Sequence, residues 1–138
     1  MTILMVMCYN DYIEKGVRMK TYIAGPYNHQ ADYRAIAKRM AAADLEVISR
    51  WIMAPEKLSD VGWAFRDKHD IFDCDLLILD LSDDTNPGKG RYVEFGIAIA
   101  TSKQIIIIGD NPDNIFLKNP YYSHFDSWDA FWVVMEGK

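Results

Sequence analysis

Two short runs of the chain, residues 76–79 and 104–108, are apolar at nearly every position. A strand with one face in water would alternate apolar and polar residues, so continuous runs of this length are typical of parallel strands covered on both faces. Segments with helical spacing of apolar residues precede both runs, at 60–73 and 91–102. The pattern therefore predicts a doubly wound α/β domain with a mostly parallel sheet and right-handed crossovers.

The rest of the chain continues the alternation of strand and helix. Gly25-Pro26 ends the first apolar run of this domain, because proline cannot continue a central ladder. Asp60 is suited to cap the helix that follows the Pro55 loop. The remaining predicted elements are strands at 21–24 and 45–48 and helices at 33–41 and 128–135.

Length and charge restrict the function classes. The chain has 138 residues, of which half are apolar, and 20 acidic against 15 basic residues give a net charge of −5. This composition indicates one globular domain and excludes intrinsic disorder. The acidic balance argues against a nucleic-acid polymer as partner. Cys8 and Cys74 form no CxxC, and the three histidines have no paired ligand spacing, so we expect no metal site and a reducing, cytoplasmic setting.

The amino-terminal apolar run, residues 3–9, is about half as long as a bilayer span. No basic segment or small-residue cleavage site accompanies it, so we expect neither an anchor nor a signal peptide, and no membrane partner. A clean strand begins just after Met19. We therefore assign the domain to 19–138 and treat 1–18 as an extension of unknown role, or as a strand or helix added to the core.

Ligands of open parallel sheets bind beyond the carboxyl ends of the strands. Three polar or glycine-rich stretches follow predicted strands, at 25–28, 80–94 and 109–111. Gly88-Lys89-Gly90 leads into a helix and offers backbone N–H groups to an anion, although a loop that needs glycine for its turn explains it equally well. Candidate ligand residues here are Gly25, Pro26, Tyr27, Asn28, Asp80, Gly88, Gly90 and Arg91.

Glu94 is the most informative of these polar residues. It lies in the first turn of the predicted helix 91–102, whose other residues are apolar nearly all round. Burying a carboxylate without a partner costs several kcal/mol, of which a helix amino end recovers only about 0.3–2 kcal/mol. A local hydrogen-bond partner or a functional role must account for it.

Helix 60–73 carries three aspartates, Asp67, Asp70 and Asp73. At 100° per residue, its apolar stripe centres between Ala64 and Phe65. Asp70 is then predicted to face solvent. Asp67 is predicted at the edge of the stripe, where its side chain can reach into a cleft.

The motifs, taken in order, resemble those of the nucleoside 2-deoxyribosyltransferase family, which includes the 2′-deoxynucleoside 5′-phosphate N-glycosidases. They are Tyr22-Ile23-Ala24-Gly25-Pro26-Tyr27, then Asp67 with Asp75 eight residues later, then the segment from Gly90 to Ala98 that contains Glu94. The resemblance covers about residues 20–110.

This resemblance implies a flavodoxin-like three-layer domain that breaks the N-glycosidic bond of deoxyribonucleosides, or of their 5′-monophosphates, without a cofactor. Deoxyribose would pass to another base or to water. By matching position, Glu94 is the nucleophile, Asp67 the acid that handles the base, and Tyr22 the tyrosine near the nucleophile. Family members are typically homo-oligomers that share residues between sites.

Some assignments stay open. Residues 81–89 are longer than the usual loop of the family, so its acidic residue falls on Asp80, Asp83 or Asp84. The sequence does not distinguish transfer of deoxyribose to a base from hydrolysis. It also does not distinguish nucleosides from nucleoside 5′-monophosphates as substrates. A nucleotide-binding or sensing module without turnover is the alternative, although binding alone does not require Tyr22, Asp67 and Glu94 together. An electron-transfer flavoprotein is suggested only by the fold.

Overall fold

The computed structural model describes residues 3–53, 58–83, 89–109 and 114–137. Five strands in these ranges form one sheet with the order β2-β1-β3-β4-β5, and every neighbouring pair is parallel. The prediction of a parallel sheet is confirmed. The strands are β1 (Met19–Ala24), β2 (Leu45–Val47), β3 (Leu76–Asp80), β4 (Gln104–Ile108) and β5 (Ser123–Phe125), of which β5 was not predicted.

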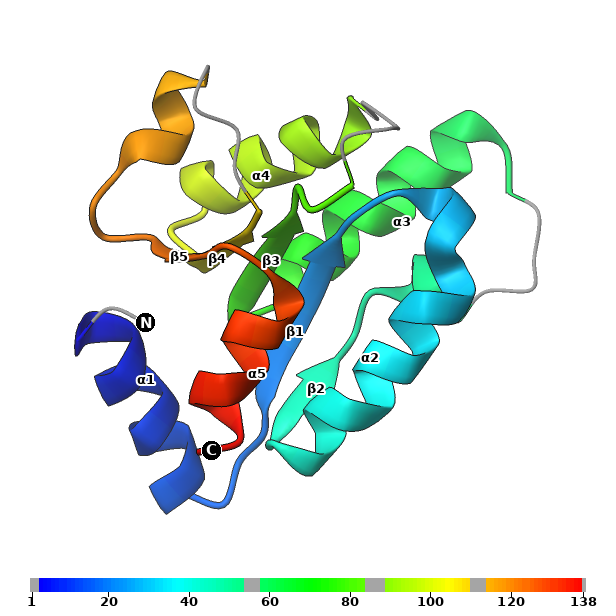
Figure 1. Ribbon diagram of the computed structural model, residues 1–138. Helices are drawn as coiled ribbons and strands as arrows, with labels where there is room; N and C mark the ends of the chain where they lie inside the picture. The colour runs from blue at the N-terminus through cyan, green and yellow to red at the C-terminus, as the bar shows by residue number, and fades with distance from the viewer. Residues whose placement is uncertain (1–2, 54–57, 84–88, 110–113, 138) are drawn as a thin grey trace.

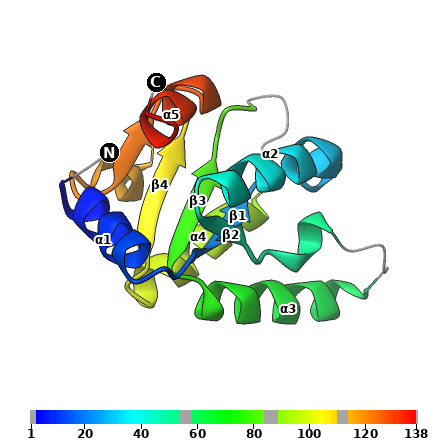
Figure 2. The same ribbon diagram turned by 90° about the horizontal axis from the view of Figure 1, so that it is seen from below.

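Helices cover both faces of the sheet, as a doubly wound domain requires. Figure 2 shows α2 and α5 on one side of the strands and α3 and α4 on the other. The three-layer α/β/α prediction is therefore confirmed. The helices are α1 (Ile3–Glu14), α2 (Gln30–Ala42), α3 (Asp60–Asp73), α4 (Gly90–Ala100) and α5 (Trp128–Met135), with short 3-10 turns η1 (Tyr27–His29), η2 (Arg50–Ile52) and η3 (Ile115–Lys118).

The two central strands form the middle of the core. All five residues of β3 are buried, and so are Ile105–Ile108 of β4, with Leu77 paired to Ile105 and Leu79 to Ile107. Side chains on both faces of these strands are covered, as their unbroken apolar runs predicted. Neither strand could therefore tolerate a charged substitution without a large loss of stability.

Residues before β1 form a helix packed on this core. Met5 of α1 is completely buried, and Tyr9 donates a hydrogen bond from its hydroxyl to the Ala43 carbonyl at 2.7 Å. The helix contacts the end of α2, at the edge where the strands begin (Figure 1). No helix in the described ranges is both long and apolar enough to cross a bilayer.

The buried face of α3 differs from the prediction. Val61 and Phe65, assigned to the apolar stripe, are 80% and 66% exposed. Asp70, predicted to face solvent, is buried. A stripe computed from apolar residues alone misses a charged residue whose burial a partner makes possible, and the Arg50 guanidinium is that partner. The face of α3 that points inward carries Asp67, Asp70 and Ile71.

Helix α4 has an exposed side, although its residues are apolar nearly all round and an apolar helix of this kind is expected to be buried. Phe95 and Ala98 are buried, but Val93 is 65% exposed. The side of the helix that carries Val93 is therefore in contact with water. Apolar side chains on the outer surfaces of both α3 and α4 remain in water.

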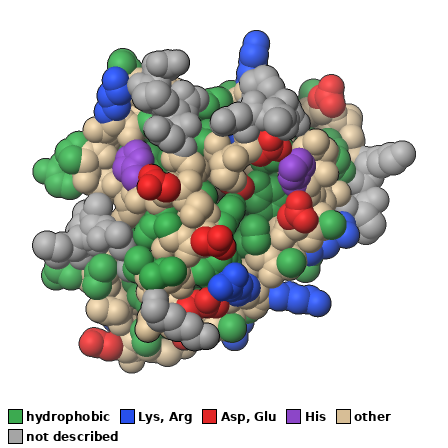
Figure 3. Space-filling view, viewed as in Figure 1, with side chains coloured by type: hydrophobic (Ala, Val, Ile, Leu, Met, Phe, Trp, Pro, Cys, Tyr) green, Lys and Arg blue, Asp and Glu red, His purple; other side chains and the backbone are tan. Residues whose placement is uncertain are grey.

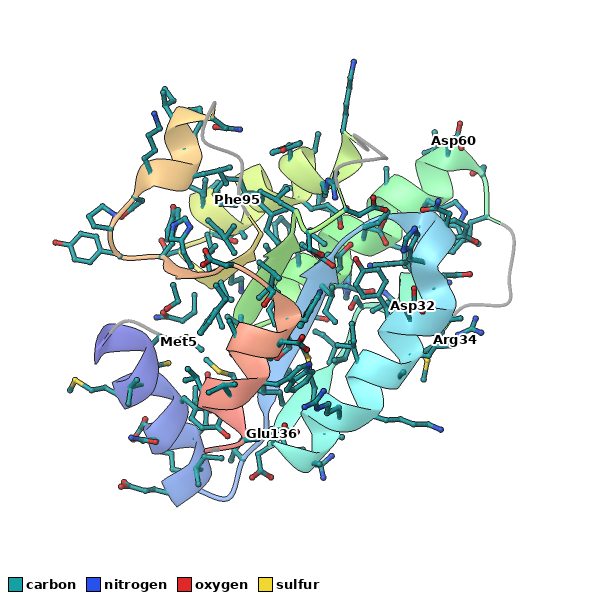
Figure 4. All side chains as sticks on the ribbon, viewed as in Figure 1. Met5, Asp32, Arg34, Asp60, Phe95 and Glu136 are labelled. Carbon is teal, nitrogen blue, oxygen red and sulfur yellow. The ribbon has the colours of Figure 1, made fainter. Side chains whose placement is uncertain are left out.

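On the opposite face of the sheet, a charged pair links the two covering helices. Arg39 of α2 donates a hydrogen bond from Nε to Oε2 of Glu136 at 2.8 Å, and Glu136, labelled in Figure 4, lies just beyond α5. Acidic, basic and hydrophobic side chains are interspersed over the surface shown in Figure 3. Packing across the sheet, rather than this exposed pair, holds the layers together, because surface ion pairs contribute about 0–1 kcal/mol.

Candidate active site

A cavity of about 420 Å³ opens at the carboxyl edge of the sheet, between the end of β1 and helices α3 and α4. Its volume falls in the range of small-molecule sites. It lies where ligands of open α/β sheets bind. The lining residues are Gly25, Pro26, Tyr27, Trp51, Trp63, Asp67, Gly90, Arg91 and Glu94.

Glu94 and Tyr22 form a hydrogen-bonded pair at the inner end of this cavity. Tyr22 belongs to β1 and is completely buried, and Glu94 stands in the second turn of α4. The Tyr22 hydroxyl donates to Glu94 Oε2. A carboxylate held in this way keeps one oxygen in a fixed position and leaves the other available to a ligand. The partner that the sequence required for Glu94 is therefore a residue of the first strand.

The surroundings of Glu94 favour its neutral form. Burial raises the pKa of Glu94 to about 8, with the negative charge of Asp67 acting in the same direction, while the hydrogen bond from Tyr22 lowers it. Burial and the Glu94 charge also raise the pKa of Tyr22 well above its ordinary value. A carboxyl group with a raised pKa in a cavity is typical of functional sites, because stability alone would select against it.

Asp67 reaches the cavity from α3 and has an unused hydrogen-bonding atom. Its Oδ1 atom is buried and has no hydrogen-bond partner among the described residues. Burial, followed by the charge of Asp70, raises the pKa of Asp67 to about 6, while Arg66 and Arg50 lower it. A buried oxygen without a partner is costly, and a hydrogen bond from a ligand can satisfy it.

Aromatic side chains form one wall of the cavity, and sequence reasoning missed two of them. The rings of Tyr27 and Trp63 meet edge to face with centroids 5.7 Å apart. The ring centroids of Tyr27 and Trp51 are 6.3 Å apart. Trp51 is fixed by a hydrogen bond from its Nε1 atom to the Ile23 carbonyl at 2.9 Å. Trp63 precedes Asp67 by one helical turn, and this i, i+4 spacing was the signal that could have found it. Such a wall suits a flat, unsaturated ring.

Arg91 and Gly25 have structural roles beside their places in the lining. The Arg91 side chain is buried and donates from Nη1 to the Asp80 carbonyl at 2.8 Å, which ties the start of α4 to the end of β3. A Cβ atom at Gly25 would overlap the Tyr33 hydroxyl, so glycine is needed there for close packing. Gly90 borders the cavity at the first residue of α4.

Asp80 lies behind the cavity and outside its lining. Its Oδ2 atom accepts hydrogen bonds from Tyr33 at 2.6 Å and from the Trp128 indole at 3.0 Å, and Oδ1 accepts from the Ser82 backbone at 2.9 Å. These bonds commit Asp80 to an internal network that joins α2, β3 and the start of α5. Asn28 in η1 is also outside the lining.

Two candidates of the glycine-rich loop, Gly88 and Asp84, lie outside the described residues. Asp83, the third acidic alternative, is 3.2 Å from Nε2 of His29. Among the described residues, no group of three or more His, Cys, Asp or Glu side chains could hold a metal ion. The chemistry-bearing side chains that the structure brings together are therefore Tyr22, Asp67 and Glu94.

Replacement of the Tyr22 hydroxyl tests the coupling within this group. In Tyr22→Phe, Glu94 loses the hydrogen bond that stabilises its carboxylate, so we expect the pKa of Glu94 to rise. A charge-assisted hydrogen bond of about 1.5–3 kcal/mol corresponds to a shift of one to two pH units. Carboxyl ¹³C NMR titration of the variant measures it.

The matched control is Tyr33→Phe, which removes a buried hydroxyl bonded to Asp80. We expect this variant to lose stability and to leave the Glu94 titration unchanged. An identical Glu94 titration in wild type and Tyr22→Phe would contradict the described pair.

Comparison with known proteins supports the architecture. The chain is similar in structure to the CMP N-glycosidase BcmB from Clostridium botulinum, with a TM-score of 0.62 and 17% identity over 85% of this chain and 97% of that one. It also resembles a conserved protein from Enterococcus faecalis V583, with a TM-score of 0.54 and 19% identity over 86% and 87% of the two chains. No family model and no curated protein matches the sequence. At these identities the likeness shows a shared α/β fold.

Proposed function

We propose that this protein cleaves the N-glycosidic bond of 2′-deoxyribonucleosides or their 5′-monophosphates and transfers the deoxyribosyl group to another base or to water. The single observation that carries the proposal is the Tyr22-bound Glu94 carboxyl, which lines the same cavity as Asp67. The sequence resemblance and the fold shared with an N-glycosidase support the same reaction. Asp67 and Glu94 then occupy the two carboxyl roles that glycosidic cleavage needs.

In the first step, an ionised Glu94 attacks C1′ as the C1′–N bond breaks. Asp67 supplies a proton to the leaving base, directly or through a water. The product is a deoxyribosyl ester of Glu94 and the neutral base. In the second step, water or another base attacks C1′, the ester bond breaks, and Asp67 takes the proton that the acceptor releases. Two displacements at C1′ retain its configuration.

The cavity walls fit the two parts of such a substrate. Tyr27, Trp51 and Trp63 would stack against the base beside Asp67. Gly90, without a side chain, leaves room for the sugar above Glu94, and Arg91 borders the same region. We expect no cofactor to take part.

A non-catalytic nucleotide-binding module would use the same aromatic wall. It would have no use for a Glu94 carboxyl that is costly to bury. The two functions are separated by a panel of the four deoxynucleosides, their 5′-monophosphates and CMP, each assayed for free base with and without adenine as acceptor. CMP is included because the neighbour from Clostridium botulinum is a CMP N-glycosidase. Thermal stabilisation by a ligand without release of base would identify a binding module.

The two carboxyl groups set the expected pH dependence of kcat/KM. Asp67 must hold a proton and Glu94 must lack one, whereas their pKa values of about 6 and about 8 place the proton mainly on Glu94. Between pH 6 and pH 8 the two carboxyl groups share one proton. The reactive form, with the proton on Asp67 and Glu94 ionised, is a minor species in that pH range. We expect a bell-shaped profile with limbs near pH 6 and pH 8. Activity that still rises above pH 9 would contradict the assignment of the acid.

Self-association is a further expectation that the family resemblance implies. The outer surfaces of α3 and α4 carry Val61, Phe65, Phe72 and Val93, which are 49–80% exposed. Exposed apolar side chains of this size favour association. Light scattering should give a mass that is a multiple of 15.9 kDa, and Phe65→Asp should shift it toward the monomer. A wild-type mass of one chain at micromolar concentration would refute it.

A further inference from the structure

Helix α3 presents two aspartates, one turn apart, on its inner face. Asp67 lines the cavity, and its Oδ1 atom is buried without a hydrogen-bond partner among the described residues. Asp70 is only 4% exposed and lies outside the cavity lining. Side chains three residues apart on a helix are about 5–6 Å apart at Cβ. A negative charge on Asp70 therefore acts on Asp67 at short range.

Asp70 is clamped by hydrogen bonds and an ion pair with Arg50. The Arg50 Nε and Nη2 atoms both lie 2.8 Å from Oδ1, and the backbone N–H of Arg50 donates to Oδ2 at 3.0 Å. Hydrogen bonds to a carboxylate from a guanidinium and a backbone N–H favour its charged state.

The 3-10 turn η2 fixes the position of Arg50. Gln30 donates to the Trp51 carbonyl at 2.6 Å, and Arg34, labelled in Figure 4, donates from Nε to the Ile52 carbonyl at 3.0 Å. Both donors belong to α2. The guanidinium that clamps Asp70 is thus attached to a part of the backbone that α2 holds in place.

We propose that Asp70, clamped by Arg50, is a positioning residue whose fixed negative charge increases the fraction of Asp67 that holds the proton for the leaving base. This inference rests on the proposed function, in which Asp67 supplies the proton to the leaving base. Two carboxyl groups at short range do not both ionise readily, so a negative charge on Asp70 favours a proton on Asp67. Asp70 accepts two hydrogen bonds from Arg50 and forms an ion pair with its guanidinium, whereas Oδ1 of Asp67 has no hydrogen-bond partner among the described residues.

Several charges act on Asp67 besides Asp70. Burial is the main cause that raises the pKa of Asp67, and Asp70 is the next. Arg66 on the same helix and Arg50 on η2 act in the opposite direction. The titratable and charged groups that face Asp67 from the other elements around the cavity are Tyr22 on β1 and Arg91 and Glu94 on α4.

Carboxyl ¹³C NMR titration of the free protein tests the proposal directly, with Asp67→Asn used to assign the signal. In Asp70→Asn, the side chain keeps its shape while the negative charge is lost and the Arg50 charge is no longer balanced. We expect the pKa of Asp67 to fall by about one unit. The acid limb of the pH profile of kcat/KM should shift to lower pH by the same amount. Loss of packing alone would not shift this limb.

The matched control is Asp73→Asn, the same substitution one turn further along α3. Asp73 is exposed and pairs with His69 at 3.3 Å, so we expect its replacement to leave the Asp67 titration in place. An Asp67 titration that is the same in Asp70→Asn and wild type would overturn the proposal. A shift of equal size in both variants would also overturn it.

A measurement on the wild type covers the case in which Asp70→Asn does not fold. In the wild type, the Asp67 carbon should titrate near pH 6, and an Asp67 titration near the ordinary value of 3.8 would overturn the proposal. The NMR titration requires no turnover, so it tests the role of Asp70 independently of the proposed cleavage reaction. Absence of base release from every substrate would refute the proposed function while the titration still decides the role of Asp70.

Discussion

Glu94→Gln should reduce the release of free base by about a thousandfold or more, because the amide cannot form the bond to C1′ and its neighbours cannot replace it. Losses of this size follow removal of a nucleophile in enzymes that use covalent catalysis. The amide still accepts a hydrogen bond from Tyr22, so the cavity should keep its shape. Single-turnover assays with the best substrate of the panel measure the effect. Turnover within tenfold of wild type in a folded variant would remove Glu94 as the nucleophile.

Thermal unfolding of the same variant separates lost chemistry from lost folding. The pKa of Glu94 is raised from 4.5 to about 8 in the folded state, so the folded protein keeps a proton that the unfolded chain releases. The contribution of Glu94 to stability therefore declines as pH rises from about 4.5 to 8. We expect Glu94→Gln to melt at a higher temperature than wild type at pH 8.5, and the difference to narrow toward pH 5. A lower melting temperature at pH 8.5 would mean that Glu94 serves the fold.

Asp67→Asn should slow cleavage by a factor of about 10²–10⁴, the usual contribution of a general acid. The amide keeps the size of the side chain, but it has no acidic proton to give to the base. The decisive comparison uses a deoxyriboside whose leaving group needs no protonation, such as 4-nitrophenolate. We expect the variant to cleave this substrate at nearly the wild-type rate, because the acid is then unnecessary.

The control for Asp67→Asn is Asp73→Asn, which changes the same charge on the exposed side of α3. It should leave both substrates unaffected. An equal loss with the natural and the activated substrate would contradict a proton-donating role and would indicate that Asp67 only binds the base.

The fold was predictable because its strongest signals are local. The unbroken apolar runs of β3 and β4 require cover on both faces, and the structure buries them as expected. Strand β5 was missed because Ser123–Phe125 is a three-residue edge strand, too short to show a period. Its place is set by pairing with β4, from Ile106 to Ile108, and such pairing is invisible along the chain.

The candidate site was predictable only in part, for a related reason. Tyr22 and Glu94 were brought together by motif resemblance, and their hydrogen bond joins residues 72 positions apart. Asp70 was misplaced because its burial depends on Arg50, which is 20 residues away. Trp51 was missed because aromatic residues are normally part of the core. Trp63 was missed although it stands one helical turn before Asp67, on the side of α3 that lines the cavity. Burial of charge and the shape of a cavity depend on tertiary partners.

Mass spectrometry of the acid-quenched protein tests the central claim most directly. The protein is mixed with its best deoxyribosyl donor in the absence of an acceptor base, quenched within one turnover and digested. We expect the peptide that contains Glu94 to gain the mass of one deoxyribosyl unit, and the gain to disappear when adenine is added before the quench. Release of base with no adduct at any quench time, or an adduct that persists in Glu94→Gln, would contradict the assignment of Glu94 as the group that bonds to C1′.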